Sequence, residues 1–163
     1  MRHTINLLVE NKMGSLSRIA GLFLARGYNI DSLSVGDAEE EGLSRMTIVV
    51  HGDDKVIEQI TKQLNKVVDV LRVNDLTMES YVNRELALIK VQALPSKRSE
   101  IMQIVDVFRA KIVDISPQTL TIETTGSEDK VQAMINMLRP FGLKEVSRTG
   151  RIAIKREFQG ETN

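Results

Sequence analysis

The sequence predicts an α+β protein built from two ferredoxin-like units, each with the element order βαββαβ. Three observations support this prediction. Apolar residues occur in strand-sized runs, stretches with helical spacing separate these runs, and the same order of elements occurs in each half of the 163 residues. We expect residues 1–78 and 84–163 to form the two units and residues 79–83 to form a polar linker.

The first unit opens with a strand and an amphipathic helix. Ile5, Leu7 and Val9 alternate along an extended segment, and Gly27 marks the end of the helix that follows. The apolar side chains of this helix recur with helical spacing. They are Leu16, Ile19, Ala20, Phe23 and Leu24.

Two strands, a second helix and a fourth strand complete the first unit. Residues 30–35 and 46–50 predict strands, and the acidic segment 36–42 predicts the turn that joins them. Asp53 is placed to cap the second helix, and the apolar run 67–73 predicts the last strand.

The second unit repeats this order. Its predicted strands lie near residues 86–93, 112–116, 120–124 and 143–147, and its helices near 99–110 and 127–138. Because helices cover only one side of each sheet, we expect the free face or edge to pair with another chain. The basic, alternating segment 148–156 predicts a strand with a solvated face, or else a contact with a partner protein.

The turn between the first strand and the first helix has the chemistry of an anion site. A helix start presents free N–H groups and partial positive charge, so a carboxylate is favoured there. Asn11 adds a side-chain amide, and Gly14 lets a ligand approach the backbone. The same pattern also fits a capped connection without a ligand. Since the matching turn 94–99 has neither Asn nor Gly, we expect one such loop per chain.

Composition argues against several other classes of protein. The chain has no cysteine, and its 22 basic and 22 acidic side chains cancel, which predicts neither a disulfide scaffold nor a nucleic-acid surface. No apolar run is long enough to predict a membrane span, and we expect a cytoplasmic protein. His3 and His51 lack the spacing of metal ligands or of a catalytic pair, so we predict no catalytic and no metal site.

Four segments carry a resemblance to a known family: Leu7–Arg18, Arg26–Leu33, Leu43–Ile48 and Lys66–Val73. The first two resemble the opening of an ACT domain. Together with the others, they resemble the small regulatory subunit of acetohydroxyacid synthase, also called acetolactate synthase. The resemblance covers the whole length and is strongest in the first half, so it implies that residues 1–78 form an ACT domain.

The resemblance also implies a function and a site. In that family the large catalytic subunit carries thiamine diphosphate, Mg and FAD and condenses pyruvate to acetohydroxyacids, in the biosynthesis of valine and isoleucine. The small subunit raises this activity and confers feedback inhibition, usually by valine. Effectors sit between the ACT domains of a homodimer. This implies an effector site made of Asn11, Gly14, Leu16 and Ser17, with Asn29 and Ile30 as the facing contribution.

Two rival interpretations also lack catalysis. The chain is either a stand-alone amino-acid sensor acting on another protein, or an assembly protein without a small ligand. A sensor binds valine without a thiamine-dependent partner, whereas an assembly protein binds no amino acid. The identity of the co-purifying partner separates all three.

Overall fold

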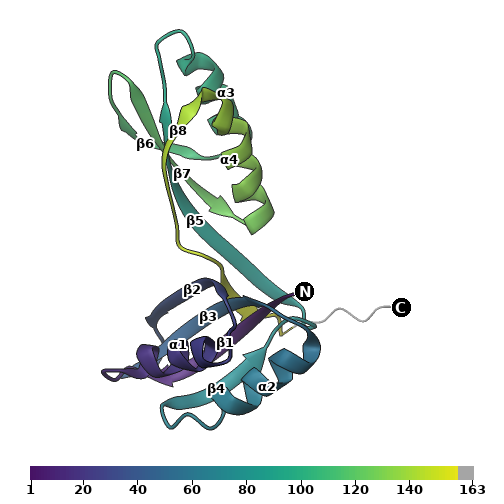
Figure 1. The fold of residues 1–163 in the computed structure, drawn as a ribbon. Coiled ribbons are helices and arrows are strands. Elements are labelled where there is room, and N and C mark those ends of the chain that lie inside the picture. Colours follow the sequence, from purple (N-terminus) through teal and green to yellow (C-terminus); the bar gives the residue numbers. More distant parts are fainter. Residues whose placement is uncertain (158–163) are drawn as a thin grey trace. The chain divides into compact units, whose positions relative to one another are not determined.

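Two antiparallel sheets, each backed by two helices, form the core of the protein (Figure 1). The structure is a computed structural model that describes residues 1–157. The predicted α+β class and the repeated βαββαβ order are confirmed. No helix within residues 1–157 combines the length and the hydrophobicity that spanning a bilayer requires.

The first sheet has the strand order β2-β3-β1-β4. Its elements are β1 (Arg2–Glu10), α1 (Ser15–Ala25), β2 (Ile30–Asp37), β3 (Leu43–His51), α2 (Asp54–Leu64) and β4 (Val70–Asp75). Strand β2 lies at one edge, and β1 pairs with both β3 and β4. The predicted cap of α2 is confirmed, because the Asp53 side chain accepts a hydrogen bond of 2.8 Å from the Val56 N–H.

The core of the first unit lies between this sheet and its two helices. Ile5, Leu7 and Val9 are buried together with Ile19 and Phe23 of α1. The predicted apolar face of α1 is therefore narrower in the structure. Its buried residues are Ser15, Ile19 and Phe23, whereas Leu16 and Leu24 are 45% and 80% exposed.

The second sheet has the strand order β6-β7-β5-β8. Its elements are β5 (Tyr81–Gln92), α3 (Arg98–Val107), β6 (Lys111–Ile115), β7 (Thr119–Gly126), α4 (Glu128–Gly142) and β8 (Leu143–Arg148). Ala87, Ile89 and Val91 of β5 pack with Ile101 of α3 and Val131 of α4 in a second core.

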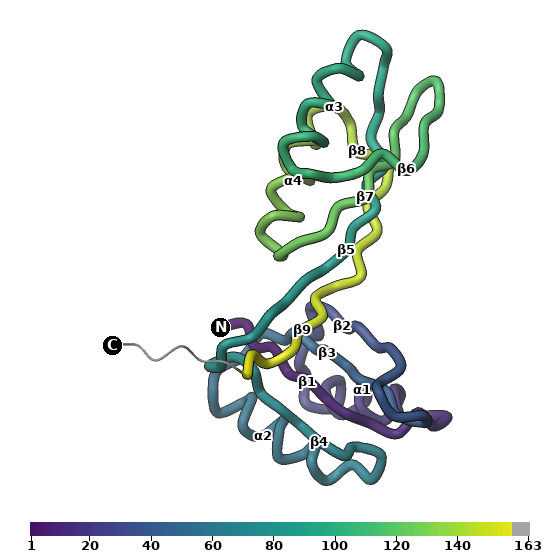
Figure 2. The backbone as a smooth tube through the Cα atoms, turned by 180° about the vertical axis from the view of Figure 1, so that it is seen from behind, coloured from purple at the N-terminus to yellow at the C-terminus, as the bar shows by residue number. Residues whose placement is uncertain are grey.

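A short last strand, β9 (Ile152–Lys155), pairs with β5 and contacts β1 and β3 (Figure 2). The chain divides into one unit of Met1–Val82 with the residues from Arg151 onward, and a second unit of Asn83–Gly150. This division differs from the predicted boundaries, which gave all of residues 84–163 to the second unit and made residues 79–83 a linker. The reason is that residues 151–156 hydrogen-bond to the first unit, and that β5 begins at Tyr81.

Candidate functional site

The predicted effector loop, residues Asn11–Gly14, joins the end of β1 to the start of α1. Gly14 is the residue before the helix and has φ +85°, a backbone conformation that favours glycine. Its carbonyl accepts the Arg18 N–H at 2.9 Å, and the Lys12 carbonyl accepts the Ser15 N–H at 3.2 Å. The backbone conformation of this turn therefore explains the glycine at position 14 without any ligand.

Two backbone hydrogen bonds fix the ends of this loop to other parts of the first unit. The Asn11 N–H donates to the Gly42 carbonyl in the β2–β3 turn at 2.8 Å. The Glu10 N–H donates to the Asp69 carbonyl, just before β4, also at 2.8 Å. The loop therefore depends on two segments that lie far from it in the sequence.

Asp69 also holds the start of α1 through its side chain. Its buried carboxylate accepts hydrogen bonds from the Ser15 hydroxyl at 3.2 Å, from Arg18 Nε at 2.7 Å, and from Arg18 Nη2. The Arg18 guanidinium holds the pKa of the Asp69 carboxyl below its ordinary value of 3.8, although burial opposes this shift. Asp69 is not predicted from the sequence, because no local pattern links a residue before β4 to the β1–α1 turn.

We expect Asp69→Asn to lower the melting temperature at neutral pH. Folding lowers the pKa of Asp69, so its ionised form favours the folded state above pH 3.8, and this stabilisation disappears as the pH falls below that value. The difference between wild type and variant should therefore shrink as the pH falls below 3.8. Melting curves over this range test the prediction. Glu58→Gln, which breaks an exposed pair with Lys62, is the control and should cost little at any pH.

The structure brings four of the six predicted site residues together within one chain. Asn11 and Gly14 lie in the loop, and Leu16 and Ser17 follow in the first turn of α1. Asn11, Leu16 and Ser17 are exposed. No backbone carbonyl in the described residues accepts the N–H of Leu16 or Ser17, so both remain open to a ligand.

The other two predicted residues, Asn29 and Ile30, lie at the opposite end of the sheet. Ile30 pairs with Val50 at one end of β3, whereas Glu10, next to the loop, pairs with Leu43 at the other end. One chain therefore does not unite all six residues. They meet only if a second copy supplies Asn29 and Ile30.

The matching turn of the second unit is closed by a side chain. Arg98, the first residue of α3, donates from Nε to the Ala93 carbonyl at 3.0 Å and from Nη2 to the Ser116 carbonyl. This guanidinium ties the end of β5 to the β6–β7 turn. That each chain carries one ligand-type loop stays a prediction.

The described residues do not gather the groups that a metal centre needs. No cluster of three or more His, Asp or Glu side chains with metal-binding geometry occurs within residues 1–157. His3 and His51 lie in β1 and β3, as expected, and interact with the Gly52 carbonyl and with Asp31, respectively. Neither histidine is near the predicted effector loop.

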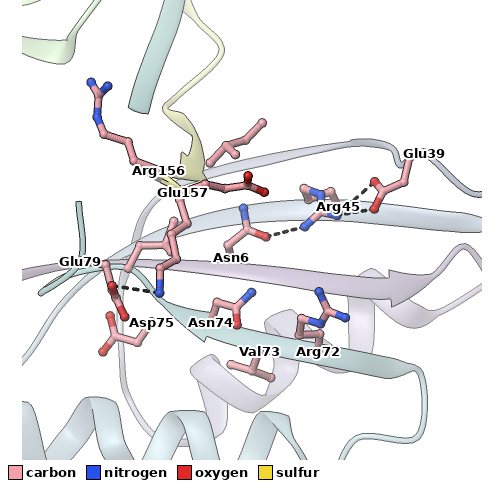
Figure 3. Close-up of a pocket in the computed structure, with 13 residues that line it drawn as sticks. Asn6, Glu39, Arg45, Arg72, Val73, Asn74, Asp75, Glu79, Arg156 and Glu157 are labelled. Carbon is pink, nitrogen blue, oxygen red and sulfur yellow. Dashed lines mark hydrogen bonds and ion pairs between the residues drawn. The ribbon is translucent and has the colours of Figure 1, made fainter. Parts of the chain in front are cut away.

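A hollow of about 960 Å³ lies in the first unit, beside β9 and above β4 (Figure 3). Arg45 lies between Asn6 and Glu39 and is joined to both, at 3.2 Å from its Nη1 to Asn6 Oδ1 and at 2.9 Å from its Nη2 to Glu39 Oε1. Lys155 pairs with Glu79 at 3.0 Å. The hollow is lined by charges of both signs, and no sequence pattern predicts it.

Comparisons with known proteins agree with this architecture in both units. Residues 5–72 match a family model described as the AHAS small subunit-like ACT domain, and residues 84–157 match one described as the small subunit of acetolactate synthase. The chain belongs to the acetolactate synthase small-subunit family. In an acetolactate synthase the small subunit is the non-catalytic, regulatory component.

Individual members of this family match over nearly their full lengths. A probable acetolactate synthase small subunit of Archaeoglobus fulgidus is 56% identical, with 96% of this chain and 98% of that protein covered. The acetolactate synthase small subunit of Bacillus subtilis is 49% identical, with 98% and 93% covered. The crystal structure of the acetolactate synthase small subunit of Thermotoga maritima superposes with a TM-score of 0.88 at 46% identity, covering 96% of this chain and 98% of that one.

Proposed function

We propose that this chain binds the large catalytic subunit of an acetolactate synthase in the cytoplasm, raises its activity and mediates feedback inhibition by valine. The observation that carries the proposal is the ACT-type first unit of a small-subunit family member, with its exposed loop at Asn11–Gly14. Thiamine diphosphate, Mg and FAD would reside on the catalytic subunit. The complex would serve the biosynthesis of valine and isoleucine.

The predicted effector loop, which is called the first loop below, offers complementary groups for a branched-chain amino acid. The open N–H groups of Leu16 and Ser17 suit the carboxylate, and the Asn11 side chain suits a polar group of the ligand. The exposed Leu16 side chain, with Ile30 of a second copy, would form the apolar wall for the valine side chain.

Strand topology supports a homodimer pocket. Strand β2 is an edge strand, so it is free to pair with β2 of a second copy. Antiparallel pairing would place the partner's Ile30 end beside the Asp37 end of this chain's β2. Asp37 pairs with Ser44, next to the Leu43 that pairs with Glu10, so the partner's Asn29 and Ile30 would approach the first loop. A ligand shared by two chains would couple binding to subunit geometry.

Reconstitution tests this proposal. We expect the purified chain to produce no acetolactate from pyruvate with thiamine diphosphate and Mg. Mixed with its catalytic subunit, it should raise turnover, and valine should reverse much of that gain. Ordinary allosteric couplings correspond to roughly 5–150-fold. Acetolactate made by this chain alone would contradict the proposal, as would an unchanged rate on mixing.

Co-purification from the source cell decides between this function and its rivals. A large thiamine-dependent partner supports the proposed role. Valine binding with any other partner favours the stand-alone sensor, and a complex that binds no amino acid favours the assembly protein.

A further inference from the structure

Strand β9 is attached to the first sheet mainly by hydrogen bonds. The Ala153 carbonyl accepts from Asn6 Nδ2 at 2.7 Å, and the Ala153 N–H donates to Thr47 Oγ1 at 3.3 Å. Only the small Ala153 is buried, whereas Ile152 and Ile154 are 56% and 69% exposed. An attachment with so little apolar burial is of the kind that opens locally while the rest of the fold stays intact.

Asn6 is the buried junction of this attachment. Its side chain is enclosed between the sheet and β9, with 3% of the residue exposed. Its amide nitrogen donates to Ala153, while its Oδ1 accepts from Arg45 Nη1 at 3.2 Å. A side-chain amide supplies a donor and an acceptor together, which a carboxylate or a hydrocarbon does not. If β9 leaves, the amide nitrogen of Asn6 loses its partner, the Ala153 carbonyl.

Arg45 joins Asn6 to the β2–β3 turn, which contacts the first loop. It binds both oxygens of Glu39, at 2.9 and 3.1 Å, and Glu39 lies in the β2–β3 turn (Figure 3). The same turn contains Gly42, whose carbonyl accepts the Asn11 N–H. Polar contacts thus connect β9 to Glu39, the backbone of the β2–β3 turn joins Glu39 to Gly42, and Gly42 accepts the hydrogen bond from Asn11.

We propose that the contacts from Ala153 through Asn6, Arg45 and Glu39 transmit the attachment of β9 to the first loop, so that the C-terminal strand tunes effector binding. Asn6 and Arg45 are positioning residues in this scheme, and its regulatory meaning rests on the proposed function. Only Thr149–Arg151 separate β9 from β8 of the second unit. The second unit is therefore joined covalently to β9, and the non-covalent contacts of β9 lead from there toward the effector loop.

Amide hydrogen exchange on the full chain, without effector, tests the connection. Asn6→Asp keeps the acceptor for Arg45 but removes the donor to Ala153, and Thr47→Val removes the other bond to Ala153 at nearly constant shape. We expect both variants to speed exchange at Ala153 and at Asn11, each by roughly fivefold, the effect of one ordinary hydrogen bond.

Arg45→Gln separates the two ends of the connection. It should speed exchange at Asn11 by a similar factor while Ala153 stays protected. Lys62→Gln, which removes the exposed ion pair between Lys62 and Glu58 in α2 of the same unit, is the matched control and should change neither site. Faster exchange at Ala153 with no change at Asn11 overturns the proposal, and so does an Arg45→Gln variant with a normal Asn11. If Asn6→Asp does not fold, the exchange rate at Asn11 in Thr47→Val tests the connection alone.

The inhibition curve of the reconstituted complex gives the regulatory readout. Asn6→Asp and Arg45→Gln should each shift the half-inhibitory valine concentration several-fold and leave the uninhibited rate unchanged. Unshifted inhibition curves in both variants overturn the proposal that β9 tunes effector binding. Failure of valine to inhibit the wild-type complex would instead refute the proposed function, and the exchange comparison, which contains no effector, would still decide the connection.

Discussion

A chain cut after Glu79 should be markedly less stable than the first unit in the intact protein. The cut removes β9 and its neighbours, and with them the bonds from Ala153 to Asn6 and Thr47 and from Arg151 to Thr4. At about 1 kcal/mol each, these three bonds amount to roughly 3 kcal/mol. Since small domains have only about 5–15 kcal/mol in total, the truncated chain should melt well below the intact unit.

A joined chain is the control for this truncation. Val82 would be connected to Arg151 by a short Gly-Ser linker, so that the second unit is absent but residues 151–157 are retained. We expect urea titrations to show higher stability for the joined chain than for residues 1–79. Equal midpoints for the two chains would show that β9 contributes nothing to the first unit. A valine response that is complete in residues 1–79 would contradict a regulatory role for the C-terminal half.

Gly14→Asp should abolish valine binding while activation of the catalytic subunit persists. A Cβ at Gly14 would lie 3.1 Å from Arg18 Nη1, so the new carboxylate would lie at the start of α1 and compete for the guanidinium that Asp69 holds. It would also repel the carboxylate of valine. Two such charges about 4 Å apart repel by on the order of 4 kcal/mol near a protein surface, which predicts a loss of affinity of at least about 100-fold.

Gly14→Asn separates charge from backbone strain. Position 14 has φ +85°, and Asn and Asp tolerate the left-handed region better than other side chains. Both variants should therefore melt within a few degrees of each other, but only Gly14→Asp should lose binding in calorimetry. If Gly14→Asn loses binding to the same extent, charge is not the cause. If Gly14→Asp binds valine normally, the loop is not the effector site.

Local patterns predicted most of the architecture. The alternation at Ile5, Leu7 and Val9 and the capping position of Asp53 depend on near neighbours, and the structure confirms both. For α1, helical spacing alone predicts a wider buried face than the structure has. Leu24 comes one position after the fully buried Phe23, so its side chain points about 100° around the helix from the buried face and is 80% exposed.

Contacts between distant segments were not predictable in this way. Asp69 supports the first loop from a position before β4, and Arg98 closes the corresponding turn of the second unit by reaching the β6–β7 turn. In β9 the usual pattern is inverted, because Ala153 faces the sheet while Ile152 and Ile154 are exposed. A hydrophobic pattern assigns the isoleucines to the interior, since it does not register that Asn6 and Thr47 offer hydrogen bonds rather than an apolar surface.

The return of β9 to the first unit has a consequence for biosynthesis. Residues 1–82 leave the ribosome first, but the strand that pairs with Asn6 and Thr47 is translated only after the whole of Asn83–Gly150. At roughly 5–20 residues per second, the nascent first unit would wait several seconds for its last strand. During that interval Asn6 and Thr47 lack their hydrogen bonds to Ala153, so premature termination within the second unit would release a chain whose first unit lacks its own last strand.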